Sequence, residues 1–155
     1  MPCMIPEKTF GLIERKLHSR YRLIDDATAN LRCAQQDAHT IRSPTASRDG
    51  GHTQGAISDK TAGYALDVIA AEAKLCAAVK WCEVFSTIDD IFANQPESQL
   101  ATLIYVQSMS AKDAAAEIGV DRRTAYAMRD RYVVHCALLA AEKGLIRLTK
   151  EGRSG

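Results

Sequence analysis

The N-terminal part of the chain carries a repeating apolar stripe. From a start at Pro6 and Glu7, apolar or small residues recur at positions 10, 13, 17, 24, 27, 31, 34, 38 and 41, which fit one heptad register. Arg20 is the only charged interruption of this register. Four or more heptads of this kind are typical of a coiled coil or a long two-helix seam, although one helix of a compact bundle would show the same pattern. The stripe therefore predicts one long helix that ends near Ile41.

A polar segment and a second long stripe follow. Residues 42–62 are rich in Ser, Thr, Gly and Asp and lack periodicity, which predicts a flexible connection. Apolar residues then recur with a helical period at positions 64, 68, 71, 75, 79, 82, 85, 88 and 92. They predict a second long helix from Ser58 or Thr61 to Asn94, with Trp81 beside its stripe as a core residue. Two helices of this length can lie antiparallel as a coiled-coil-like arm.

Three shorter helices are predicted after Pro96, which ends the second long helix. They cover Glu97–Gln107, Ala111–Ile118 and residues 122–143, and Gly144 is placed to end the last one. The predicted regions are a helical arm for oligomerisation over 1–95, a three-helix unit over 96–146 and a basic tail over 147–155. The all-α class agrees with an aromatic content of only 6% and an apolar share rich in alanine, which favours helices over sheets.

The stretch SMSAKDAAAEIGVDRRTAYAM has the pattern of a helix-turn-helix. Counted from Ala111, a small residue is fifth (Ala115), where two helices must cross closely, and Gly119 is ninth, where the turn favours positive φ. Asp121 is a suitable N-cap for the second helix. Apolar residues occupy the shared core positions: Ala114, Ile118, Val120, Ala125 and Met128. The alternative is an ordinary helical hairpin in a bundle, whose arginines form a solvated face.

Candidate DNA contacts lie at and around the start of the second helix of this motif. In a helix-turn-helix the N-terminal residues of that helix meet base edges in the major groove. Residues 122–153 carry eight Lys or Arg against three acids, whereas residues 63–100 carry two Lys against six acids. The expected base or phosphate contacts are Arg122, Arg123 and Tyr126, and the expected phosphate contacts are Lys112, Arg129 and Arg131.

Other classes of protein find little support. The five cysteines are an odd number without zinc-site spacing, which predicts free thiols and no metal site. The chain has no glycine-rich phosphate loop and no GxSxG motif, so we expect neither an enzyme nor a cofactor. It also lacks a signal-peptide pattern and a run of about 18 apolar residues, which predicts a cytoplasmic protein with no membrane association.

The residues from Leu100 to Ala137 resemble small phage or prophage transcriptional regulators of the ArpU and RinA kind. The shared pattern is a tyrosine near the end of one helix (Tyr105), a helix that ends in Ile-Gly, and a capped helix with Arg, Thr and Tyr. The chain departs from it in having Asp121 rather than serine as the cap. The resemblance implies a helix-turn-helix similar to that of sigma factor region four, control of late phage genes and contact with RNA polymerase.

The sequence thus favours a sequence-specific DNA-binding regulator. We expect a homodimer, because two recognition helices could then reach half-sites one helical turn apart on double-stranded DNA. One alternative is a DNA-packaging protein similar to a small terminase subunit, which also joins a helix-turn-helix to an oligomerisation region. Another is a helical protein-interaction module that binds no DNA.

Overall fold

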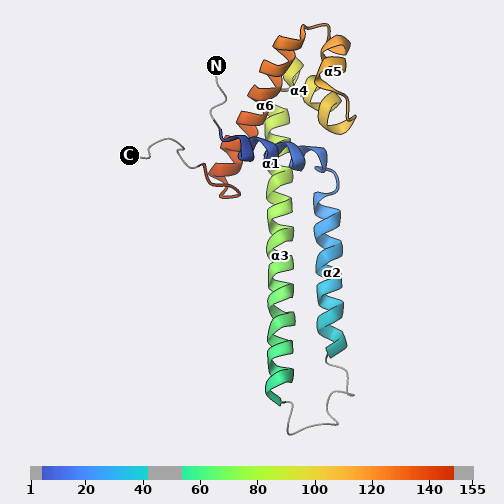
Figure 1. Ribbon diagram of the computed structural model, residues 1–155, viewed down its shortest axis with the longest axis vertical. Coiled ribbons are helices and arrows are strands. Elements are labelled where there is room, and N and C mark those ends of the chain that lie inside the picture. Colours follow the sequence, from blue (N-terminus) through green and yellow to red (C-terminus); the bar gives the residue numbers. More distant parts are fainter. Residues whose placement is uncertain (1–4, 42–53, 149–155) are drawn as a thin grey trace, which may run out of the picture. The chain divides into compact units, whose positions relative to one another are not determined.

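The computed structural model describes residues 5–41 and 54–148, with side chains over 5–39 and 61–148. All regular elements in these ranges are helices, which confirms the all-α prediction for them. In chain order the helices are α1 (Glu7–His18), α2 (Leu23–Ile41), α3 (Gln54–Ile91), α4 (Pro96–Ala101), the π-helix η3 (Thr102–Val106), α5 (Ala111–Ile118) and α6 (Arg122–Glu142) (Figure 1). No helix among the described residues is long and apolar enough to cross a membrane.

The chain divides into two compact units that share α3. The first unit joins the residues up to Arg20 with those from Lys80 onward, and the second spans Tyr21–Val79. Residues of α1 and of the last part of α3 therefore belong with the C-terminal helices, a grouping that sequence periodicity does not reveal.

The prediction of one continuous helix from Glu7 to Ile41 is wrong. The helix stops at His18, and α2 begins at Leu23. The Ser19 amide and hydroxyl both donate to the Arg15 carbonyl, at 3.2 and 2.9 Å, which closes the end of α1. The Arg20 guanidinium then donates to Asp89 of α3 at 2.8 Å. The one charged interruption of the heptad register is thus the place where the helix breaks, because Arg20 is held by a partner distant in sequence.

The second long helix starts earlier than expected. It begins at Gln54 rather than at Ser58 or Thr61, so the predicted connection over 42–62 is helical in its last part. Residues 42–53, and residues 149–155 of the predicted tail, lie outside the described residues. The predicted core position of Trp81 is confirmed, since only 4% of its surface is exposed.

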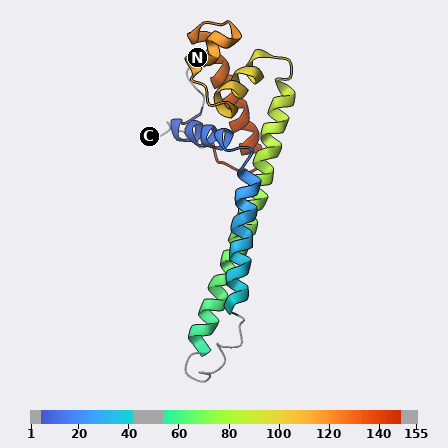
Figure 2. The same cartoon turned by 90° about the vertical axis from the view of Figure 1, so that its right-hand side faces the viewer.

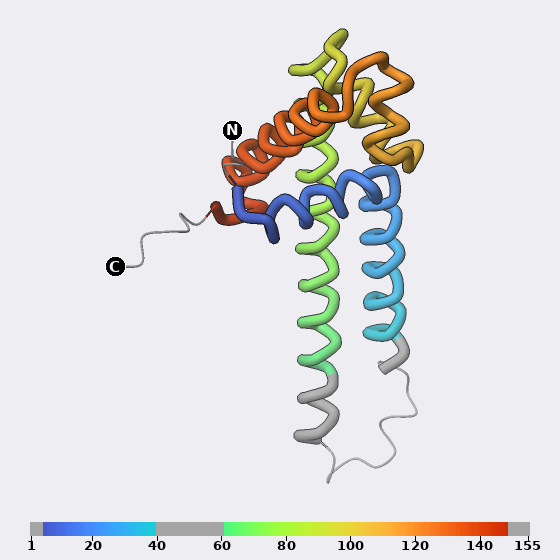
Figure 3. Tube along the Cα trace, turned by 45° about the horizontal axis from the view of Figure 1, so that its top comes forward, coloured from blue at the N-terminus to red at the C-terminus, as the bar shows by residue number. Residues whose placement is uncertain are grey.

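Helix α6 lies at the centre of the first unit. It contacts α1, α4 and α5, and α5 also contacts α4 and η3 (Figure 3). The largest side chains that are fully buried in this unit are Tyr132, Phe85, Ile13, Leu17, Ile88, Leu100, Val84, Val133 and Cys136.

The predicted helix from Glu97 to Gln107 is present but changes type along its length. Pro96 is its first residue, a position where the missing amide proton costs nothing. Beyond Ala101 the backbone widens into the π-turn η3, in which the Gln107 amide donates to the Thr102 carbonyl at 3.1 Å. The turn that follows contains Ser108 in the left-handed region, with φ 57°.

The second unit consists of α2 and the first part of α3, which lie side by side (Figures 1 and 2). Among its described side chains, only Ala27, Ala71 and Ala78 are buried. The heptad stripe is therefore mostly not enclosed, and Ile24 in it is 39% exposed.

Candidate nucleic-acid interface

The turn between α5 and α6 is built by Gly119. Its φ of 86° lies in the left-handed region, which glycine adopts without the steric penalty of a Cβ atom. The amides of Gly119 and Val120 both donate to the Ala115 carbonyl, at 2.9 and 3.0 Å. Both bonds satisfy the Ala115 carbonyl in the last turn of α5, and the chain then turns directly into α6. The sequence prediction for this turn is confirmed.

The two helices meet through small side chains. Ala114 and Ala115 of α5 are buried, and so are Ala125 and Met128 of α6. At the start of α5, the Ser110 hydroxyl accepts a hydrogen bond from the Asp113 amide at 3.1 Å and caps the helix. The sequence placed the small residues correctly but did not identify Ser110 as the cap.

Asp121 occupies the N-cap position of α6, as predicted, with extended backbone angles. Its side chain makes no capping hydrogen bond of normal geometry to a backbone amide. The nearby Thr124 hydroxyl nevertheless lowers the pKa of the Asp121 carboxyl, and the first amides of the helix add to this effect. Asp121 is therefore negatively charged at neutral pH, where it complements the positive end of the α6 dipole.

Arg122 and Arg123 follow this cap and are exposed to solvent. The Arg122 guanidinium donates to the Tyr126 hydroxyl from Nε at 3.3 Å and from Nη2 at 3.2 Å. It also lies 5.5 Å from the centre of the Tyr126 ring. This arrangement orients Arg122 along the helix while its remaining N–H groups stay available. Lys112 of α5 is exposed as well.

Arg129 is held more tightly. Its guanidinium lies 4.9 Å from the centre of the Tyr126 ring and 5.2 Å from that of Phe10 of α1. It donates to Asp130 at 2.9 Å, and its side chain is only 24% exposed. Burial alone would lower the pKa of Arg129, but the Asp130 carboxylate raises it above its ordinary value. Arg129 is thus a charged and mostly buried side chain where α1 meets α6.

Arg131 has an acidic partner on another helix. It donates from Nη1 to Oε1 of Glu97 at 2.8 Å, and the Glu97 side chain is 7% exposed against 57% for Arg131. Glu97 is the one buried charged residue among the described side chains. This pair connects α4 to α6. The guanidinium has five N–H donors, so Arg131 can still offer others to a phosphate.

Two further acids, Asp89 of α3 and Glu14 of α1, hold buried tyrosines of this unit. Asp89 of α3 accepts from the Tyr132 hydroxyl at 2.6 Å and from Arg20 at 2.8 Å. Glu14 of α1 accepts from the Tyr105 hydroxyl of η3 at 2.9 Å. Burial is the main reason that the pKa of both tyrosines rises above its ordinary value. These supporting acids were not identified from the sequence; the signal available there was only that each lies next to an apolar stripe.

The structure therefore brings together Arg122, Tyr126 and Arg129 through direct contacts. Arg123 of α6 and Lys112 of α5 are exposed, and Arg131 pairs with Glu97. Within the described residues, no group of three or more His, Cys, Asp or Glu side chains is arranged to hold a metal ion. Comparison with protein-family models, with curated proteins and with solved structures finds no match to this chain.

Proposed function

We propose that α5 and α6 form a DNA-binding helix-turn-helix in which α6 is the recognition helix. The observation that carries the proposal is the position of Arg122 and Arg123. They are exposed in the first turn of a helix whose other face, at Ala125 and Met128, is buried. Exposed arginines at the start of such a helix can make bidentate bonds to guanine in the major groove.

The expected contacts differ in kind. Arg122, Arg123 and Tyr126 are proposed to read bases or hold phosphates, with Tyr126 positioning Arg122 through its hydroxyl. Lys112, Arg129 and Arg131 are proposed as phosphate contacts, which orient a protein on DNA without reading its sequence. Among these three, Lys112 is expected to contribute most, because the guanidinium groups of Arg129 and Arg131 already bind acids.

We further propose that this DNA-binding unit regulates transcription of phage or prophage genes from the bacterial cytoplasm, as a homodimer that contacts RNA polymerase. The support for a regulator and for the polymerase contact is the resemblance of residues 100–137 to regulators of the ArpU and RinA kind. A DNA-packaging role differs in one measurable property, because it predicts a ring of many subunits rather than a dimer.

Selection of bound duplexes from a random library at defined salt tests the DNA-binding proposal. The expected result is an enriched motif whose affinity falls linearly with log salt, with a slope of about −0.9 for each neutralised phosphate. An absence of salt-dependent binding would contradict the proposal, and an enriched palindrome would support the dimer.

The role of the α6 start is tested with Arg123→Ala and a matched control, Lys80→Ala, which removes one exposed positive charge from α3. We expect Arg123→Ala to weaken binding to the selected site by about 5- to 150-fold, from about 1–3 kcal/mol for a good base contact. Lys80→Ala is expected to change it by less than about twofold. Equal effects of the two substitutions would remove Arg123 from the interface.

A further inference from the structure

The hairpin of α2 and the first part of α3 buries too little of itself to be stable alone. Its described side chains include only three buried residues, and all three are alanines. Helices in proteins owe most of their stability to packing of an apolar face rather than to intrinsic propensity. Cover from another surface would therefore add to the stability of the hairpin.

The apolar side chains that lack cover are large. Leu66 is 64% exposed and Ile69 is 60% exposed, and both lie on α3. The two residues are three apart on one helix, so they form one apolar patch, and exposed apolar patches mark interaction sites.

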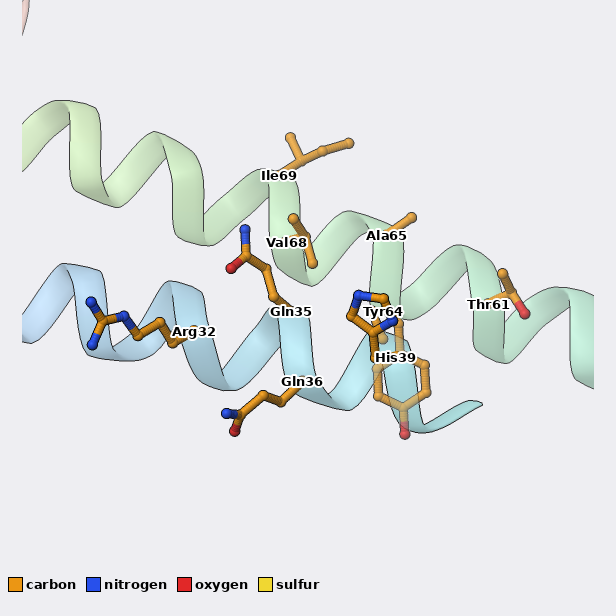
Figure 4. Close-up of a pocket in the computed structure, with 10 residues that line it drawn as sticks. Arg32, Gln35, Gln36, His39, Thr61, Tyr64, Ala65, Val68 and Ile69 are labelled. Atoms are coloured by element: carbon orange, nitrogen blue, oxygen red, sulfur yellow. The ribbon is translucent and has the colours of Figure 1, made fainter. Parts of the chain in front are cut away.

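A groove of about 710 Å³ lies on this hairpin, between α2 and α3. Figure 4 shows Val68 of α3 and Gln35 of α2 facing each other along it, with Tyr64 and His39 close together farther along, toward Thr61. Its lining combines small side chains, such as Ala65, with larger ones, such as Ile69. Ile69 lines this groove, and Leu66 lies three residues before it on α3, so exposed apolar surface continues along α3 from the edge of the groove. A face with both projecting side chains and a hollow is what a self-complementary two-fold interface needs.

We propose that a second copy of this chain covers this face, so that two hairpins form a four-helix bundle about a two-fold axis. A partner would stabilise the hairpin whenever it is folded, and an identical chain is the partner that is always present with it. A transient partner would leave Leu66 and Ile69 in water between encounters.

Charge and size agree with this occupant. Arg32 is the one charged side chain that lines the groove, and the described part of the hairpin carries three Arg or Lys against five Asp or Glu. Arg32 of each copy would thus have acids of the other copy to pair with, which offsets part of the repulsion between two hairpins that each carry more acids than bases. A face as long as α2, about 28 Å, and two helices wide offers on the order of 600–800 Å² per copy, near the ~800 Å² per partner of a stable interface.

Sedimentation or light scattering of the full chain without nucleic acid tests the proposal independently of DNA binding. We expect a mass of twice the 16.9 kDa chain at 50 µM. Leu66→Glu with Ile69→Glu should raise the dimer dissociation constant by at least about 100-fold, because carboxylates would be buried opposite each other. The control is Leu138→Glu on α6 in the other unit, where the apolar side chain is 52% exposed, and this variant should remain a dimer.

A second measurement tests the proposal even if the variant with Leu66→Glu and Ile69→Glu does not fold. Amide exchange of the unaltered chain is compared above and below its dissociation constant. We expect dilution to remove protection from residues 23–39 and 61–79 but not from residues 122–142. A single chain at 50 µM or a larger ring would overturn the inference. So would a dimer that survives the double substitution, dissociation by Leu138→Glu, or protection that is independent of concentration.

Discussion

Removal of the Asp89 carboxylate should destabilise the first unit more than any exposed substitution near it. Asp89 accepts hydrogen bonds from Tyr132 of α6 at 2.6 Å and from Arg20, which follows α1, at 2.8 Å. Tyr132 is fully buried, so its hydroxyl has no access to water when this acceptor is lost. Asp89 of α3 thereby connects α6 to the segment that follows α1.

The magnitude follows from these two bonds. A hydrogen bond to a charged group contributes about 1.5–3 kcal/mol, and a partly exposed ion pair contributes about 0–1 kcal/mol. The Asp89 side chain is 34% exposed, which places the tyrosine bond in the lower half of its range. We therefore expect Asp89→Ala to cost about 2–3 kcal/mol and Tyr132→Phe to cost about 1.5–2 kcal/mol in free energy of unfolding. The double variant should fall short of the sum by about 1–2 kcal/mol.

Urea unfolding followed by tryptophan fluorescence measures these differences. Trp81 is the only tryptophan of the chain, and it is buried in the same unit beside Phe85. With a urea dependence of about 1–3 kcal/mol per molar, the midpoint for Asp89→Ala should fall by about 1–2 M. Asp90→Ala is the control, since this neighbouring carboxylate is exposed, and it should stay within about 0.5 kcal/mol. Strict additivity in the double variant, or equal effects at Asp89 and Asp90, would refute the reasoning.

Three further predictions use the same assay. Gly119→Ala should cost about 1–2 kcal/mol in free energy of unfolding. The cost comes from the φ of 86° alone, since an added Cβ meets no atom within 4 Å. Gly11→Ala in α1, where an added Cβ also meets no atom within 4 Å, should instead stabilise the protein by about 0.5–1 kcal/mol. Ser108→Gly should stabilise by about 1 kcal/mol, since φ is 57° there, and a loss would place the serine side chain in an essential contact. Burial raises the pKa of the Cys136 thiol above its ordinary 9.0, so the unfolded state binds fewer protons above that pH. The free energy of unfolding should therefore fall above pH 9 by up to about 1.4 kcal/mol per pH unit. Cys136→Ala should flatten this slope between pH 9 and 10. An unchanged slope would show that the Cys136 thiol is not its cause.

The α5–turn–α6 segment could be predicted almost completely because its signals are local. Gly119 is needed for the turn, Ala115 permits close approach, and Asp121 begins the next helix, so each residue constrains its own neighbours. The contact candidates Arg122 and Arg123 also follow from position along α6.

The partners of the other candidate residues could not be predicted in this way. In the sequence Arg131 cannot be distinguished from other surface charges, because its partner Glu97 on α4 is 34 positions away. The sequence likewise marked Arg129 as a phosphate contact but could not show that its guanidinium lies against the rings of Phe10 of α1 and Tyr126. Such contacts join segments that share no periodic pattern.

By itself the sequence determined the helical class, the turn at Gly119 and the exposed start of α6, because backbone preference and side-chain spacing act within a few residues. The tertiary structure alone decided where the first apolar stripe breaks. Arg20 leaves the helical path because Asp89 offers it a charged partner, and such pairing depends on chain segments that only folding brings together. Folding likewise decided which residues are enclosed, burying Trp81, Phe85 and Ile88 of α3 while Leu66 and Ile69 of its first part remain exposed.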